Sequence, residues 1–173
     1  FEVVSKYAVH NFSVSFTLKK HGENNSIRTQ ASPTPVEIIR TIYGNEVANS
    51  LLKVTAESED LKFKMIGFIS KADYSGKKGQ FLLFINHRLV ESKTLKKALF
   101  EDLYRALLTN SIQPFIYMSI ELDPGNVDVN VSPTKNEVTF LNEDMIIHEI
   151  KVAVEGILLQ TNETRKMFVQ QLL

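Results

Sequence analysis

Hydrophobic and polar residues alternate along this chain with a period that changes several times. In residues 1–9 the apolar side chains recur at helical spacing, which predicts a short helix. Residues 12–18 then alternate apolar and polar side chains strictly, the pattern of a half-buried strand. The polar stretch 21–24 predicts a turn into a second, more polar strand near residues 26–30.

The clearest helix start lies at Thr34. Its hydroxyl can cap the helix, Pro35 suits the first helical position, and Glu37 can reach back to the amide of the cap. Gly44 is placed to end this helix.

The rest of the chain alternates strands and helices. Residues 81–85 form a continuous apolar run, as expected of a central strand covered on both faces. The other predicted elements are strands at 52–58, 61–70, 115–122 and 127–131, a helix over 92–108 capped by Ser92, a type II turn at 123–126, a short strand at 138–140, and a final helix after Asn142. This order predicts one mixed α/β layer structure, with the strands before and after the helix 92–108 running parallel.

Composition limits the classes of protein that fit. The chain has 173 residues, 43% of them apolar, and a formal net charge of zero, which suits one folded domain and argues weakly against a dedicated nucleic-acid binder. It contains no cysteine and no apolar run of membrane-spanning length. We therefore interpret four glycosylation sequons as accidental and the compartment as intracellular. The start at Phe1 suggests a piece of a longer protein.

No complete active site is visible in the residue types alone. The four histidines (10, 21, 87 and 148) lack metal-ligand spacing, and the sequence Gly76-Lys77-Lys78-Gly79 lacks the full phosphate-loop pattern. On this evidence the chain is an α/β domain without its own catalytic machinery.

Two stretches resemble the MutL homologues of DNA mismatch repair, and the eukaryotic MutL homologue one branch in particular. They are Phe84-Ile85-Asn86-His87-Arg88-Leu89-Val90-Glu91-Ser92 and Asn126-Val127-Asp128-Val129-Asn130-Val131-Ser132-Pro133-Thr134-Lys135-Asn136-Glu137-Val138. Shorter matches extend the resemblance over essentially the whole chain.

The resemblance implies a specific part of that family. Residues 1–160 resemble the transducer domain that follows the nucleotide-binding module, and residues 161–173 an extension leading to a linker. The implied fold is like the second domain of ribosomal protein S five: a two-layer α/β (α+β) structure, a mixed sheet with helices on one face and a left-handed βαβ crossover. No cofactor is expected in this fragment, whereas ATP and Mg belong to the parent ATPase.

The resemblance gives Lys135 a role. In the family, the lysine of this motif reaches the γ-phosphate of ATP held by the neighbouring module, where it can sense the third phosphate and neutralise charge during phosphoryl transfer. Ser132 stands where relatives usually have histidine, but Pro133 and Lys135 are kept. Outside such a motif, a loop lysine is usually only solvated.

A second candidate site is a basic cluster at the junction between a strand and a helix. Arg88, Lys93, Lys96 and Lys97 are candidates for binding DNA through its phosphates, weakly and independently of sequence. The alternative, an ordinary charged helix face, fits the spacing of Glu101 and Arg105 equally well.

Three functions are therefore compared: the transducer of a mismatch-repair ATPase, a stand-alone nucleic-acid-binding domain, and a dimerisation scaffold. A requirement for Lys135 separates the first from the other two. The resemblance also implies a Pms-type MutL homologue as heterodimer partner, a MutS homologue complex upstream, DNA as a ligand and a nuclear location, with no membrane association and no activity for the fragment alone.

Overall fold

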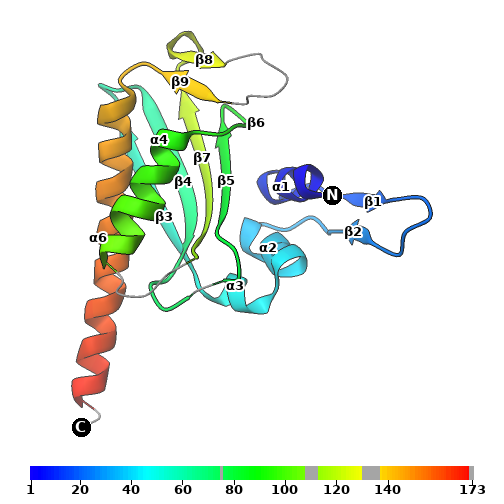
Figure 1. Ribbon diagram of the computed structural model, residues 1–173, viewed down its shortest axis with the longest axis horizontal. Helices are drawn as coiled ribbons and strands as arrows, with labels where there is room; N and C mark the ends of the chain where they lie inside the picture. The colour runs from blue at the N-terminus through cyan, green and yellow to red at the C-terminus, as the bar shows by residue number, and fades with distance from the viewer. Residues whose placement is uncertain (75, 108–112, 130–136, 172–173) are drawn as a thin grey trace. The chain divides into compact units, whose positions relative to one another are not determined.

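The structure is a computed structural model that describes residues 1–74, 76–107, 113–129 and 137–171, with their side chains except at 129 and 162–169. The chain divides into two units, residues 1–51 and residues 52–173. The first unit is mainly helical, and the second contains the principal sheet (Figure 1).

The first unit begins with α1 (Glu2–His10), which confirms the helix predicted at 1–9. The strand predicted over 12–18 is wrong for most of its length, because only β1 (Thr17–Lys19) pairs, in antiparallel register with β2 (Ser26–Arg28). Residues 11–14 form a turn after α1 instead, in which the Val14 amide donates to the Asn11 carbonyl at 2.9 Å, so the extended pairing begins later. Val14, which the alternation assigned to a buried face, is 54% exposed.

The helix α2 (Pro35–Tyr43) starts and ends as predicted, and a short α3 (Asn45–Asn49) follows it. The Thr34 hydroxyl accepts a hydrogen bond from the Val36 amide at 3.3 Å, with Pro35 at the first helical position. Gly44 ends the helix at φ 107°, a conformation open mainly to glycine. The predicted contact of Glu37 with the amide of the cap is wrong, because the Thr34 amide donates to the Ser32 hydroxyl at 3.3 Å and Glu37 forms an ion pair with Arg40 at 3.4 Å.

The second unit is built on a five-stranded sheet with the order β3-β4-β7-β5-β6. Its strands are β3 (Leu51–Ser58), β4 (Phe63–Ser70), β5 (Gln80–Ile85), β6 (Arg88–Leu89) and β7 (Phe115–Leu122). The pairing of β5 with β7 is parallel, as predicted, and the neighbouring β4–β7 and β5–β6 pairs are antiparallel. The middle of the sheet is β7, and β5 lies beside it with residues 82–85 buried.

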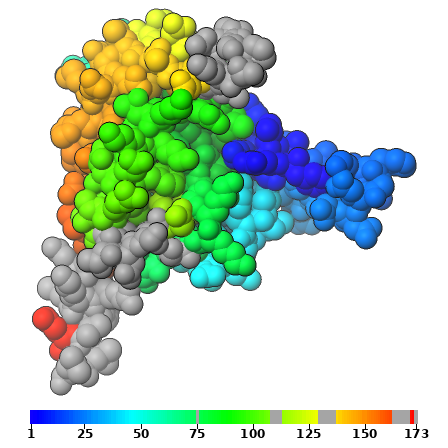
Figure 2. Space-filling view, in the orientation of Figure 1, coloured from blue at the N-terminus to red at the C-terminus, as the bar shows by residue number. Residues whose placement is uncertain are grey.

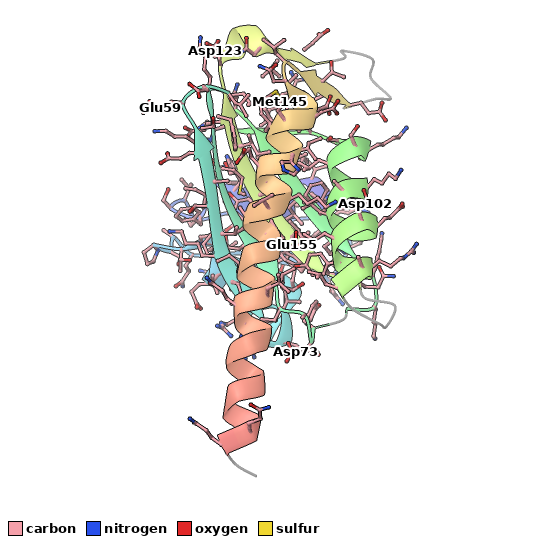
Figure 3. All side chains as sticks on the ribbon, turned by 90° about the vertical axis from the view of Figure 1, so that its left-hand side faces the viewer. Glu59, Asp73, Asp102, Asp123, Met145 and Glu155 are labelled. Carbon is pink, nitrogen blue, oxygen red and sulfur yellow. The ribbon has the colours of Figure 1, made fainter. Side chains whose placement is uncertain are left out.

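Helices cover one face of this sheet. A continuous helical stretch runs through α4 (Lys93–Lys96), the π-helix η1 (Lys97–Tyr104) and α5 (Arg105–Leu107), and α6 (Glu143–Gln171) lies beside it in front of the strands (Figure 3). The core between the two layers includes Leu83 and Met118 from the sheet, Leu99 from η1, and Ile150 and Val154 from α6. The predicted two-layer mixed α/β architecture is confirmed.

The cap predicted at Ser92 is also present, since its hydroxyl accepts a hydrogen bond from the Leu95 amide at 3.2 Å. The helix α6 continues across residue 160 as far as Gln171. The division into a transducer domain at 1–160 and an extension at 161–173 stays a prediction, as does the left hand of the β5–β7 crossover.

The predicted type II turn at 123–126 is wrong. Such a turn needs a positive φ at Gly125, but the glycines with positive φ in the described part of the chain are Gly22 and Gly44. The segment forms instead the 3₁₀ turn η2 (Pro124–Asn126), because the Asp123 side chain accepts the Gly125 amide at 3.0 Å. The hairpin of β8 (Val127–Val129) and β9 (Val138–Phe140) follows.

None of the helices in the described ranges is long and apolar enough to cross a membrane.

Candidate functional site

The two stretches that carry the family resemblance meet at one end of the second unit. Glu91, which follows β6, forms a parallel bridge with Glu137, and its carbonyl accepts the Val138 amide at 3.1 Å. The surface of the α4 helix continues into that of the β8–β9 hairpin on this side of the molecule (Figure 2). Two segments that are 46 positions apart in the chain are thereby joined by backbone hydrogen bonding.

A side-chain contact reinforces this backbone contact. Lys93 Nζ lies 2.7 Å from Glu137 Oε1, within the range of a charge-assisted hydrogen bond. The hydrogen bond and the negative charge of Glu137 raise the pKa of Lys93. The Lys93 side chain is 85% exposed and that of Glu137 only 35%, so the carboxylate is the more buried partner of this ion pair.

Lys135, Pro133 and Ser132 lie in residues 130–136, outside the described residues. Both ends of that segment are described, and they pair with each other: Val129 is the register partner of Val138. The strands on either side of the segment, β8 and β9, therefore pair antiparallel, and β9 is tied to Glu91. These contacts hold Val129 and Glu137, the described residues on either side of the segment that contains Lys135.

Arg88 lies at the start of β6, immediately after a tight turn. The two central residues of this turn, Asn86 and His87, have φ values of 48° and 66°. Two positive φ angles are typical of a type I′ hairpin turn, and asparagine tolerates them well. The Asn86 side chain accepts a hydrogen bond from the Leu122 amide at 2.8 Å, which ties the turn before Arg88 to the end of β7.

The other candidate basic residues occupy the first turns of the helical stretch. Lys96 Nζ lies 5.7 Å from the centroid of the Phe100 ring, within cation–π distance, and Lys97 is exposed. Three lysines near a helix N-terminus are unfavourable to the helix dipole, and the carboxylate of Glu137 partly offsets this repulsion. Lys93, Lys96 and Lys97 thus lie on the first turns of one helical stretch, while Arg88 lies on β6 just before it. Lys93 has an acidic partner in Glu137.

A separate groove of about 440 Å³ lies along strands β3, β4 and β7. Its charged lining is mixed, with Glu57 and Glu121 near Lys64. It contains none of the predicted site residues. No group of three or more His, Cys, Asp or Glu residues that could hold a metal ion occurs among the residues the structure describes.

Sequence reasoning missed two residues of the site, Glu137 and Asn86. Both lie inside the motifs quoted above, but a single acid or amide gives no local signal of a distant partner. The sequence offered two hints of this contact. Glu137 is an acid two positions after Lys135, and Lys93 is a lysine in the first turn of a predicted helix.

Comparison with known proteins decides the family. The family described as "DNA mismatch repair protein, C-terminal domain" matches residues 39–159. The chain belongs to this DNA mismatch repair family. The predicted resemblance to MutL homologues is thereby confirmed.

Individual relatives agree with this assignment. The mismatch-repair chain is 39% identical to the DNA mismatch repair protein MLH1 of Saccharomyces cerevisiae over 86% of its length. It is 33% identical to Mlh1 of Dictyostelium discoideum and 38% identical to the putative MutL protein homolog 1 of Schizosaccharomyces pombe, each over 99% of its length. The chain spans only 20–25% of these three relatives.

Solved structures share the fold. The N-terminal domain of a DNA repair protein matches 92% of the chain with a TM-score of 0.72 at 22% identity, and the chain covers 52% of that structure. The Aquifex aeolicus MutL ATPase domain matches 88% with a TM-score of 0.58 at 20% identity, and the chain covers 49% of it. At these identities the likeness concerns the fold alone.

Proposed function

We propose that the chain is the transducer part of a MutL-type mismatch-repair ATPase, and that its loop lysine Lys135 senses bound ATP. The observation that carries the proposal is the anchoring of the Lys135 loop: its ends pair as Val129–Val138, and Glu137 is held by Glu91 and Lys93. A fixed base lets a single lysine side chain reach a defined point on a neighbouring module.

The chemistry assigned to Lys135 needs only a mobile ammonium on a positioned loop. Such a group gains a strong partner while a γ-phosphate is present and loses it when the phosphate leaves. ATP and Mg would be bound by the nucleotide module of the parent protein. In that setting Lys135 would contribute charge neutralisation during phosphoryl transfer.

DNA binding is a second part of the proposal. Arg88, Lys96 and Lys97 would meet DNA phosphates, with Lys93 contributing only when it leaves Glu137. Contacts of this kind carry no base information, so binding should be weak and similar for different sequences. A Pms-type MutL homologue as partner, action after a MutS homologue complex, and a nuclear location belong to the same proposal.

The test is an ATPase assay on the longer protein that contains the nucleotide module. Lys135→Ala should lower turnover at saturating ATP by an order of magnitude or more, because losing one contact to a developing charge costs about 2.7–4 kcal/mol. The matched control is Lys78→Ala, which removes an exposed lysine elsewhere in the chain and should leave turnover unchanged.

Equal turnover in the Lys135→Ala variant and the natural protein would contradict the proposed role. It would favour a stand-alone nucleic-acid-binding or dimerisation domain, since neither needs a lysine in this loop.

A further inference from the structure

The helix α6 has two apolar faces. Its inner face is formed by Ile146, Ile150, Val154 and Leu158, each no more than 1% exposed, which pack in the core. Its outer face carries Met145, Val152 and Leu159, which are 59%, 52% and 42% exposed. Figure 3 views α6 from this outer side, with Met145 near its upper end.

The three outer residues form one line along the helix. They are spaced seven residues apart, close to two helical turns, and this line lies opposite the buried face. Single exposed apolar residues are ordinary on protein surfaces, whereas an aligned set on one helix face is typical of helix pairing. We call Met145, Val152 and Leu159 the outer stripe.

Space beside the outer stripe favours close approach of another helix. A Cβ placed on Gly156 would meet no atom within 4 Å, so the backbone is open at this point between Val152 and Leu159. Small residues at helix surfaces let a partner backbone come close.

The flanks of the outer stripe are acidic. Glu149 lies on one side, and Glu155 lies on the other side together with His148. Lys151 lies nearer the buried face and is itself half-buried. Carboxylates flanking an apolar seam select a partner that carries cations at the matching positions.

These charges argue against a second copy of the chain as the occupant. In an antiparallel pair centred on Val152, Glu149 of one copy would face Glu155 of the other. A parallel pair of helices has two core positions in each heptad, a and d. If the outer stripe occupies position a, Glu155 of both copies meet at position d; if it occupies position d, Glu149 of both copies meet at position a. Like charges in such positions are destabilising in both arrangements.

We propose that the outer stripe of α6 is a docking surface for an amphipathic helix of another protein, one with apolar residues at heptad spacing flanked by lysine or arginine. This surface belongs to the same unit as the Lys135 hairpin, but the proposal does not depend on nucleotide sensing.

The test uses the full-length parent protein and two synthetic helical peptides of about 21 residues, roughly six turns. Both peptides have leucine at heptad positions a and d; one has arginine and the other glutamate at e and g. Binding is followed by fluorescence anisotropy of labelled peptide. The arginine peptide should bind with one-to-one stoichiometry, and the glutamate peptide should bind at least about tenfold more weakly.

Variants then locate the binding surface. Val152→Lys should lower the affinity for the arginine peptide by about tenfold or more, as expected for the loss of a central apolar contact. The double variant Glu149→Lys with Glu155→Lys should reverse the preference between the peptides. The matched control is Ile66→Lys, since Ile66 is 48% exposed on β4, and it should change neither affinity.

Circular dichroism checks that each variant is folded, and Val152→Gln replaces Val152→Lys if the latter is not. Absence of arginine-peptide binding, equal affinity for the two peptides, or equal losses in the Val152 and Ile66 variants would each overturn the proposal. Self-association of the parent that Val152→Lys abolishes would overturn it as well, in favour of a second copy as occupant.

Discussion

Lys93 Nζ lies 2.7 Å from Glu137 Oε1, and this pair joins the first residue of α4 to the residue at which the Lys135 loop ends. The contact is solvent-exposed at the lysine, so its contribution to stability is small. The ion pair matters for the position of Glu137, because it adds a side-chain contact to the backbone hydrogen bond between Val138 and Glu91.

Breaking this pair should affect turnover of the longer ATPase more than its stability. Lys93→Glu and Glu137→Lys should each lower turnover severalfold, because the loop end loses a contact and like charges meet. Each should change the free energy of unfolding by less than about 1 kcal/mol, as is usual for exposed pairs.

The double exchange Lys93→Glu with Glu137→Lys restores the opposite charges and should recover part of the turnover. A double-mutant cycle measures this coupling. Additive losses in the double variant would show that the pair does not act as a unit.

DNA binding should depend on the basic region rather than on total charge. Reversing Arg88 and Lys97 to glutamate should weaken binding of the longer protein equally for matched and mismatched duplexes. The salt dependence should become shallower by about one unit of slope for each lost phosphate contact. Lys62→Glu with Lys64→Glu is the matched control. An equal loss of DNA affinity in this control would show that only the net charge of the protein matters.

The isolated chain should neither bind nor hydrolyse ATP measurably, because the proposal gives it one phosphate contact and leaves the base and Mg to another module. Calorimetric titration with a non-hydrolysable ATP analogue measures this. Affinity in the micromolar range would mean that the chain carries a nucleotide pocket of its own.

Tyr104→Phe should destabilise the second unit. The buried Tyr104 hydroxyl donates to the Ser70 carbonyl at 2.7 Å, which ties the π-helix η1 to the end of β4. Burial, the dominant effect, raises the pKa of Tyr104. Removing the hydroxyl leaves a buried carbonyl without this donor, at a cost of about 1–3 kcal/mol in denaturant unfolding.

The control for this variant is Thr41→Val, which removes an exposed hydroxyl that donates to the Glu37 backbone carbonyl at 3.0 Å. It should cost no more than about 0.5 kcal/mol. Equal costs in the two variants would contradict a special role for the buried bond.

Stability should show a small pH dependence from Glu143 in the first turn of α6. Partial burial, and then the nearby charge of Asp144, raise the pKa of Glu143. A raised carboxyl pKa in the folded state means that this group favours folding most when protonated and loses that contribution as pH rises through its folded pKa. Glu143→Gln should therefore raise stability at neutral pH, by less than about 1 kcal/mol because solvent screens a group that is only partly buried.

The gain from Glu143→Gln should shrink as the pH falls below the ordinary glutamate range, because the natural side chain is then neutral too. Thermal unfolding at several pH values measures it, with Glu149→Gln as an exposed control on the same helix. A gain that does not change with pH would contradict the assignment to ionisation.

Local signals in the sequence were sufficient for several elements. The caps at Thr34 and Ser92 depend on a side chain and an amide two or three positions apart, so the residue types predicted them correctly. The apolar run at 81–85 and the helix after Ser92 likewise predicted a parallel strand–helix–strand unit, which the β5–β7 pairing confirms.

Tertiary structure decided what depends on distant partners. The alternation at 12–18 is a strand pattern, but the strand is limited to Thr17–Lys19 because residues 11–14 form a turn after α1, with the Val14 amide donating to the Asn11 carbonyl. At the candidate site, the motif pointed to Lys135, whereas only the folded chain brings Glu137 to Lys93 and Glu91. Hydrogen bonds and ion pairs between residues far apart in the chain have no period or spacing in the sequence, since they form only when the fold places their atoms within about 3 Å.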